Sequence, residues 1–330
     1  MTTAPKLAKE ILAGYVSGAS VELAKVRDKD GSPKLTSQAS FVSRDFTDFE
    51  SILNLYFKRH KGEISHACFG VAGPVISNEV HTTNLPWHLH GGNIEQRFGI
   101  PKVQLLNDIV AFGHGLPSLD KDRFYTLNEG VRSANGNVGL IAAGAGLGEA
   151  IIYVTGGRHY PYASEGGHAG FTPGTQLESE LWEYIYGDHG YVEVEDVLSL
   201  AGLERIYNFL IDSDGASLPS WMEKSSDRPS AIIEKALSGR DEYAAKTLDV
   251  FIDCLATEAA NLALKGMTLG GVYLGGLIGP QIITMLDNGK FMERFVRRGK
   301  MESVLARMPV GVVIEEKTAL IGAATVALRM

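Results

Sequence analysis

Two short stretches combine carboxylate, amide and imidazole side chains that could do chemistry on a hydroxyl-bearing ligand. In the first, Asn107 and Asp108 follow the apolar run of residues 103–106, which has the length and β-branched start of a buried strand. An aspartate at the end of a strand can accept a proton from a hydroxyl group, and an asparagine beside it can hold a neighbouring hydroxyl. Asp108 also fits a helix N-cap before Ile109, and this stretch alone favours the cap.

The second stretch is residues 164–171, in which Glu165 and His168 lie among glycines. A carboxylate accepts hydrogen bonds and a neutral imidazole can donate one and accept one, so a loop presenting both would suit a polyhydroxylated ligand. A simple turn fits nearly as well. A metal site is disfavoured, because the sequence has no His-Glu-x-x-His motif and no cysteine cluster.

Three glycine-rich turns, at residues 14–20, 144–148 and 275–279, each follow a predicted strand. Glycine lets backbone N–H groups converge on an anion without a side chain in the way. One such turn also fits a hairpin, but two in a strand-turn-strand context favour phosphate handling. The sequence has no P-loop pattern and no dinucleotide fingerprint that opens a helix, which argues against both of those nucleotide sites.

Strands and helices must position these residues. Residues 11–15 and 21–26 are predicted to form a strand, a turn and a strand, and residues 138–154 repeat that shape, which indicates two related α/β lobes. Further strands are predicted at residues 41–42, 66–71 and 271–276. Helical spacing of apolar residues predicts helices at residues 47–60, 93–98, 178–186, 194–210, 230–237, 242–264 and 318–328.

Composition narrows the class of protein. The 330 residues are 45% hydrophobic with a net charge of −8, which predicts a soluble globular protein without nucleic acid or an anionic membrane as partner. Cys68 and Cys254 lie in apolar stretches and are expected to be buried thiols, which fits a cytoplasmic location. Residues 1–6 lack a signal-peptide pattern, and no apolar run is long enough for a membrane span.

Six motifs, taken together and in this order, resemble the bacterial glucokinase family, relatives of hexokinase that lack the zinc cysteine cluster of the repressor–kinase group. They are Thr83-Asn84-Leu85-Pro86-Trp87, Leu106-Asn107-Asp108, Ala143-Gly144-Ala145-Gly146-Leu147-Gly148, Ser164-Glu165-Gly166-Gly167-His168, Glu195-Asp196-Val197-Leu198-Ser199 and Gly275-Gly276-Leu277-Ile278-Gly279-Pro280. The resemblance implies a two-lobed actin-like ATPase (ribonuclease H-like) α/β fold with an interlobe cleft. A small α/β domain would comprise residues 1–115 and 315–330, and a larger one with helical additions residues 116–314.

The resemblance also implies ATP-dependent phosphorylation of glucose to glucose 6-phosphate by a homodimer, with Mg²⁺ bound transiently with the nucleotide and no resident metal site. Asp108 would be the general base for the 6-hydroxyl. The implied sugar-binding residues are Asn84, Asn107, Asp108, Glu165, His168 and Glu195. The implied ATP-binding residues are Gly14, Ser17, Gly18, Gly144, Ala145, Gly146, Gly148, Gly275 and Gly276.

The first phosphate turn departs from the family pattern. The family has Asp-x-Gly-Gly-Thr, whereas Tyr15 stands here in place of the aspartate that organises magnesium, Ser17 in place of a glycine and Ala19 in place of the threonine. Losing one preorganised charge-stabilising group typically costs about 3–4 kcal/mol in the barrier, or roughly 10²–10³ in rate. Glu22, Ala145 and residues 200–202 are further departures. Sugar binding should therefore survive better than phosphoryl transfer.

These departures leave two alternatives open beside a glucokinase. The chain could be a catalytically impaired sugar-binding or regulatory protein that uses the same residues without competent transfer. A weaker alternative keeps the fold and changes the sugar or the phosphoryl donor, for example to polyphosphate.

Overall fold

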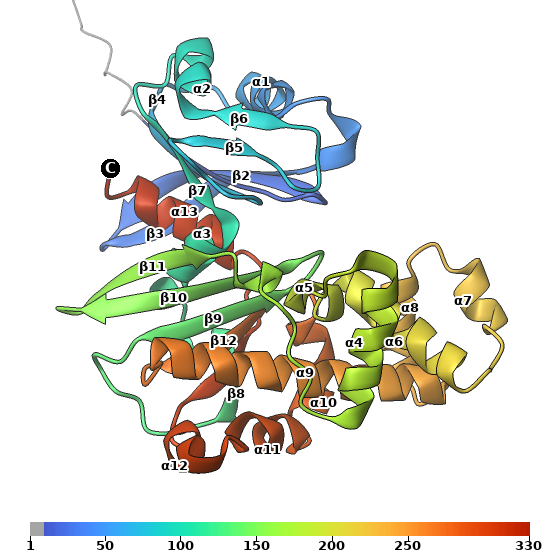
Figure 1. Ribbon diagram of the computed structural model, residues 1–330. Coiled ribbons are helices and arrows are strands. Elements are labelled where there is room, and N and C mark those ends of the chain that lie inside the picture. Colours follow the sequence, from blue (N-terminus) through green and yellow to red (C-terminus); the bar gives the residue numbers. More distant parts are fainter. Residues whose placement is uncertain (1–9) are drawn as a thin grey trace, which may run out of the picture. The chain divides into compact units, whose positions relative to one another are not determined.

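The computed structural model describes residues 10–330 (Figure 1). The expectation that no signal peptide is present concerns residues outside this range. The chain divides into two compact units. Unit 1 contains the chain up to Lys121 together with Glu315–Met330, and unit 2 contains Asp122–Ile314. The chain therefore leaves unit 1, builds unit 2, and returns to complete unit 1.

Unit 1 is built on a five-stranded sheet in the order β3-β2-β1-β4-β7. Its strands are β1 (Glu10–Val16), β2 (Ser20–Lys29), β3 (Ser32–Val42), β4 (Ile64–Val71) and β7 (Val103–Asn107). The first three form an antiparallel meander, whereas β1, β4 and β7 are parallel. The predicted strands of this half of the chain are confirmed, and the strand predicted at residues 41–42 is the end of the much longer β3.

Helices cover both faces of this sheet. Successive residues of β1 point to opposite faces, so they belong to two different cores. Leu12 belongs to the apolar core that includes α1 (Phe49–Arg59), and Ala13 belongs to the core formed with α13 (Thr318–Ala327). Its alanines let α13 pack closely against the sheet, as the sequence predicts. A Cβ atom built on Gly322 of α13 would lie 1.7 Å from the carbonyl oxygen of Ala111.

Three further elements of unit 1 carry or flank candidate site residues. The hairpin of β5 (Glu79–His81) and β6 (His88–His90) precedes α2 (Gly91–Phe98), and α3 (Asp108–Gly115) follows β7 directly. Short 3-10 turns at Ser43–Asp45 and Leu116–Ser118 connect the rest, and a third, at Lys121–Arg123, leads the chain from unit 1 into unit 2.

Unit 2 repeats the five-strand sheet order of unit 1, as the strand-turn-strand repeat in the sequence indicates, and adds β8 antiparallel to β13. Its six strands run β11-β10-β9-β12-β13-β8, with β9, β12 and β13 parallel. Their bounds are β8 (Phe124–Asn128), β9 (Val138–Ala143), β10 (Leu147–Thr155), β11 (Arg158–Ser164), β12 (Gly271–Gly276) and β13 (Val310–Val313). The glycine turns after β9 and β12 therefore lie at the same edge of the sheet.

The longest helix of unit 2 is α9 (Glu242–Gly266), which has 25 residues and an extensive buried face. The others are α4 (Gln176–His189), α5 (Val194–Val197), α6 (Leu200–Ser213), α7 (Ser220–Lys224), α8 (Arg228–Leu237), α10 (Ile283–Leu286), α11 (Lys290–Val296) and α12 (Glu302–Leu305), with 3-10 turns at Gly166–His168, Gly279–Ile282 and Gly299–Met301. The prediction of one helix over residues 194–210 is wrong. The chain breaks before Ser199, whose side chain accepts a hydrogen bond from the Gly202 N–H and starts a new helix.

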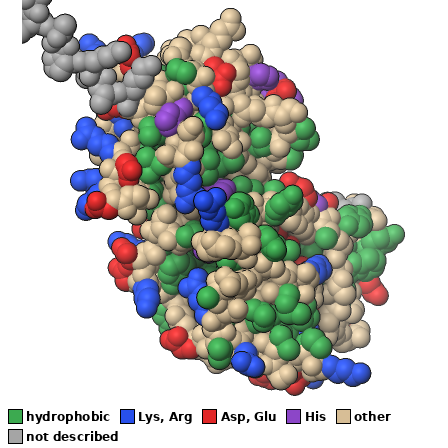
Figure 2. Space-filling view, turned by 90° about the vertical axis from the view of Figure 1, so that its left-hand side faces the viewer, with side chains coloured by type: hydrophobic (Ala, Val, Ile, Leu, Met, Phe, Trp, Pro, Cys, Tyr) green, Lys and Arg blue, Asp and Glu red, His purple; other side chains and the backbone are tan. Residues whose placement is uncertain are grey.

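Both cysteines are free and buried, as predicted from their apolar surroundings. Burial raises the pKa of the Cys68 thiol to about 12 and that of Cys254 well above its ordinary value, so neither is a reactive thiolate at neutral pH. Among residues 10–330 no helix is long and apolar enough to cross a membrane. Lys and Arg side chains on the face in Figure 2 are interspersed with acidic and uncharged ones.

Candidate active site

Asn107 and Asp108 lie where strand β7 ends and helix α3 begins. The side-chain oxygen of Asn107 accepts hydrogen bonds from the N–H groups of Ile109 (3.1 Å) and Val110 (3.4 Å), so the N-cap is Asn107. The interpretation of Asp108 as the cap is wrong by one residue, and Asp108 is the first residue of the helix. The Asn107 amide also donates to the carbonyl of Gly73 (3.0 Å), which leaves it one further N–H for a ligand.

Tyr15 belongs to the same end of the sheet as Asp108. It lies opposite Glu22 on β2 and Gly70 on β4, and a Cβ atom on Gly70 would lie 3.9 Å from the Tyr15 ring. Burial, and then the negative charges of Asp108 and Glu22, raise the pKa of the Tyr15 phenol above its ordinary value of 10.0. Tyr15 is therefore a neutral phenol beside Asp108, and it cannot replace an anionic carboxylate as a magnesium ligand.

The β1–β2 turn holds its own polar groups. The hydroxyl of Ser17 donates to the carbonyl of Ser20 (3.0 Å) and accepts from the Ser20 N–H (3.0 Å). Ser17 therefore closes the turn locally. Asn84 lies against this turn, because a Cβ atom built on Gly18 would come within 2.9 Å of the Asn84 Cβ. The structure thus brings two predicted site residues, Gly18 and Asn84, into contact.

Gly14 lies within β1 and is buried. A Cβ atom there would lie 2.7 Å from side-chain carbons of Leu23 and of Phe69. Close packing inside the sheet is therefore sufficient to explain a glycine at this position.

In unit 2, Glu165 and His168 come together with a carboxylate that the sequence analysis missed. The Nδ1 atom of His168 lies 2.6 Å from the Glu193 carboxylate, and its Nε2 lies 4.0 Å from that of Glu165. Hydrogen bonding to Glu193, with the charges of Glu195 and Glu165, raises the pKa of His168 above its ordinary value of 6.5. His168 is half exposed, so its Nε2 can donate to a ligand hydroxyl.

The segment around Glu193 owes its position to backbone pairing. The N–H of Val194 donates to the carbonyl of Ala169, and that of Phe171 donates to the carbonyl of Val192. The nearby sequence feature that could have pointed to Glu193 is Asp196, whose carboxylate accepts the Glu193 N–H and caps the short helix α5. That signal predicts a helix start and gives no indication of the contact with His168.

Glu195 contacts the glycine turn between β9 and β10. Its carboxylate accepts the N–H of Leu147 (2.7 Å), and a Cβ atom on Gly146 would lie 2.5 Å from the same oxygen. A side chain at position 146 would displace this carboxylate, so the glycine lets Glu195 approach the turn. A predicted sugar-binding residue and the predicted phosphate turn are therefore neighbours in unit 2.

The second and third glycine turns meet at the edge of the unit 2 sheet. Gly275 and Gly276 pair with Ala142 and Ala143, and the N–H of Ile278 donates to the Ala143 carbonyl. Gly276 has φ +82°, and a Cβ atom there would lie 2.3 Å from the Ala143 oxygen. The carboxyl ends of parallel strands β9 and β12 thus place two bare backbone turns side by side, an arrangement suited to phosphate and nucleotide.

The remaining members of the Gly144–Gly148 turn complete this edge. Gly144 donates its N–H to the carbonyl of Gly146 (2.8 Å), and its carbonyl accepts from Leu200. Ala145 is exposed at the tip, and Gly148 pairs with Ala142 in the β9–β10 ladder. The break before α6 therefore helps to fix the turn, because Leu200 is the first residue of that helix.

Glu149 is a second carboxylate that the sequence analysis did not single out. It is 3% exposed on β10, and a Cβ atom on Gly166 would lie 2.1 Å from its Oε2. Its Oε1 has no hydrogen-bond partner among the described residues. Burial and the nearby Glu258 raise its pKa to about 7. A charged residue inside an apolar strand sequence was the available signal.

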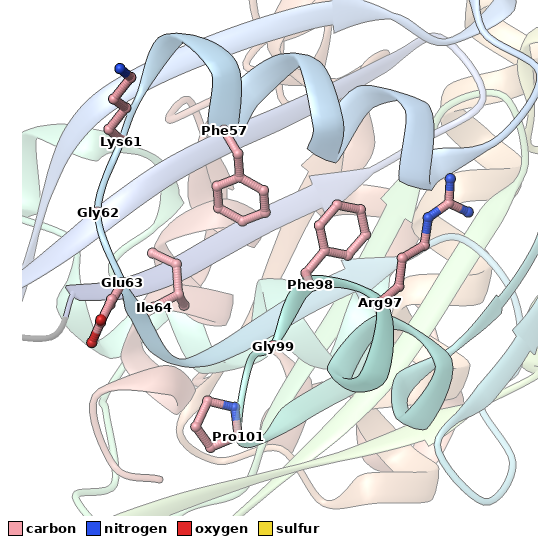
Figure 3. A pocket seen from close by; sticks show the side chains of 9 residues that line it. All are labelled: Phe57, Lys61, Gly62, Glu63, Ile64, Arg97, Phe98, Gly99 and Pro101. Atoms are coloured by element: carbon pink, nitrogen blue, oxygen red, sulfur yellow. The ribbon is translucent and has the colours of Figure 1, made fainter.

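A surface pocket of about 620 Å³ lies elsewhere in unit 1 (Figure 3). Its apolar part includes Phe57 and Phe98, whose ring centroids are 5.5 Å apart, and Lys61, Glu63 and Arg97 supply charges. It contains none of the predicted site residues.

Known protein sequences match this chain over nearly its whole length. The family model described as Glucokinase matches residues 12–330. A glucokinase of Nostoc punctiforme is 35% identical over 338 residues, covering 97% of this chain and 99% of the relative. One of Synechocystis is 33% identical over 344 residues, covering 96% and 97%.

The chain belongs to the glucokinase family.

Solved structures agree with this membership. A glucokinase from an Antarctic psychrotroph is 28% identical with a TM-score of 0.84, covering 98% of this chain and 100% of that one. A Streptomyces griseus ROK family glucokinase in complex with glucose and AMPPNP is 18% identical with a TM-score of 0.68, covering 97% and 100%, and shows the fold alone. The chain has the actin-like ATPase fold and is an ATP-dependent sugar kinase of the glucokinase family, so an interpretation as a sugar-binding protein without catalysis is not favoured.

Proposed function

We propose that this chain phosphorylates glucose at its 6-hydroxyl with ATP as donor, and that Asp108 is the general base. The observation that carries the proposal is the position of Asp108 at the carboxyl end of parallel strand β7, as the first residue of α3. The positive end of the helix stabilises a negative charge there. As the sugar oxygen bonds to the γ-phosphorus, its proton passes to the Asp108 carboxylate and ADP leaves with the electrons of the broken bond.

Polar side chains are proposed to bind the other sugar hydroxyls. Asn107 offers its remaining amide N–H, and Asn84 offers an exposed amide beside the β1–β2 turn. Glu165 and Glu195 accept hydrogen bonds. His168, held by Glu193, donates from Nε2. Such donors and acceptors orient the 6-hydroxyl for in-line attack, and positioning together with electrostatic stabilisation is what a protein contributes to this reaction.

The glycine turns of unit 2 are proposed to bind the nucleotide, with residues 144–148 at the phosphates and Gly275 and Gly276 beside the adenosine. Mg²⁺ would arrive with ATP and neutralise charge on the phosphates. In unit 1, Gly18 and Ser17 of the β1–β2 turn are proposed as nucleotide-binding residues. We further propose that the protein is a homodimer and acts in glycolysis. We also propose a cytoplasmic location, which suits the free, buried thiols of Cys68 and Cys254.

Replacing Asp108 with Asn tests the proposal. The amide cannot accept the hydroxyl proton, so kcat should fall by about 10²–10⁴ while glucose binding remains measurable. A coupled assay of ADP release with glucose measures the rate, and calorimetry measures glucose binding. Asp120→Asn, an exposed residue of the same unit, is the matched control and should keep the parent rate. Turnover that persists in Asp108→Asn would refute the assignment of the base.

A further inference from the structure

The β5–β6 hairpin of unit 1 gathers two histidines and a glutamate on one face. His81 pairs directly with His88 across the two strands, and Glu79 lies two residues before His81. Because side chains alternate along a strand, these three share a face, while Val80 and Leu89 point into the core. His81 and His88 are exposed, and Glu79 is half-buried.

The three side chains already lie close enough to bind one ion. One ligand atom from each of Glu79, His81 and His88 lies within 4.8 Å of the other two. The two imidazole rings stack with centroids 4.1 Å apart and planes 1° apart, and the Nε2 of His88 is hydrogen-bonded to the Glu79 carboxylate.

We propose that Glu79, His81 and His88 form a binding site for a divalent transition-metal ion such as Zn²⁺. Two imidazoles and one carboxylate are the ligands that Zn²⁺ accepts in three-residue protein sites, with water in the fourth position. Small side-chain rotations bring the ligand atoms to about 2.0–2.2 Å from the ion. The ion displaces the proton shared by His88 and Glu79, which returns to solvent.

The site would act on the loop that joins the two strands. Residues 82–87 leave β5 at His81 and re-enter β6 at His88, and their base is closed by the bond from the Thr82 N–H to the Trp87 carbonyl (3.0 Å). A metal bound to both histidines crosslinks the two ends of this loop. Asn84 lies at its tip, so an effect on glucose rests on the proposed function, whereas metal binding and loop protection do not.

Calorimetry on the full, untagged, chelator-treated chain with Zn²⁺, together with Co²⁺ absorption spectroscopy, tests the site. One bound ion with a tetrahedral Co²⁺ spectrum is expected. His81→Ala and His88→Ala should each weaken binding by at least about tenfold, the lower end of the loss that even an indirect partner of a metal ligand causes. His159→Gln in β11 removes one histidine elsewhere and should leave the affinity unchanged. Equal affinity in His81→Ala and the parent would overturn the site.

Hydrogen–deuterium exchange tests the crosslink independently of kinase activity. Zn²⁺ should slow exchange across residues 79–90 in the parent, and the double variant His81→Ala/His88→Ala should lose that effect. Unchanged exchange in the parent under saturating Zn²⁺, or slowing that survives in the double variant, would overturn the proposal that the ion holds the loop.

Discussion

At the scale of single residues, Glu149 links acidity to stability. Its pKa of about 7 in the folded protein lies above the ordinary value of 4.5, so between these values the folded state binds more protons than the unfolded state. The contribution of Glu149 to the free energy of unfolding is fully present below pH 4.5 and is lost as pH rises through about 7. Burial is the main cause, because the ionised form loses its hydration.

Glu149→Gln should therefore gain stability relative to the parent as pH rises. Between pH 5 and pH 8 the advantage should grow by on the order of 3 kcal/mol, since each unit of pKa shift corresponds to about 1.4 kcal/mol. Urea unfolding at a series of pH values measures it. Glu223→Gln, at an exposed carboxylate, is the control and should follow the parent at every pH. A constant difference across this range would contradict the assigned pKa.

Residues whose role is local could be identified from the sequence, and those with distant partners could not. Asp108 follows an apolar strand, and glycines mark turns, so their positions follow from neighbours in the chain. Glu193 reaches His168 only because residues 192–194 pair with residues 169–171. The spacing of apolar and polar residues along the chain does not indicate a contact between segments so far apart in the sequence.

At the scale of elements, the β1–β2 turn combines the expected geometry with altered chemistry. The strands and the tight turn are where the sequence predicts them, and Ser17 fits by bonding within the turn. The side chain at position 15 differs most from the family pattern, because a neutral ring stands where a carboxylate would organise magnesium. Backbone shape is therefore retained while charge is lost.

The triple change Tyr15→Asp, Ser17→Gly and Ala19→Thr should raise kcat for glucose by at least about 10², the effect of one charge-stabilising group. The ADP-release assay measures the gain. Tyr15→Phe keeps the ring without its hydroxyl and should give none. If the triple variant is no faster than the parent, the first turn does not limit the rate.

Elements with a clear local pattern, such as α1, α9 and β4, are close to their predicted bounds. The break between α5 and α6 was missed because apolar spacing continues through it, and only the capping hydroxyl of Ser199 interrupts the helix. Strand β11 was missed because its alternating residues are mostly exposed, so it lacks an apolar face.

At the scale of the whole molecule, unit 1 depends on a helix that lies beyond unit 2 in the sequence. Helix α13 packs on α3 so closely that their backbones touch at Gly322 and at Gly115, where an added Cβ atom would lie 2.1 Å from the Thr318 oxygen. Small residues on both helices make this contact possible.

Gly322→Ala should destabilise unit 1 by about 1–3 kcal/mol, because the new methyl group overpacks against Ala111. In an open helix the same change is favourable by up to about 1 kcal/mol, and Gly187→Ala in α4, with nothing within 4 Å, should show that sign. Hydrogen–deuterium exchange, which reports the two units separately, measures both. A stabilising Gly322→Ala would contradict the close helix contact.

The return of the chain to unit 1 has a consequence for biosynthesis. When the ribosome has finished residues 10–121, the alanine-lined face of that sheet still lacks its cover, and almost two hundred further residues of unit 2 must be made first. At about 5–20 residues per second, that face stays open to chaperones for roughly ten seconds or more, and the unit begun first is completed last.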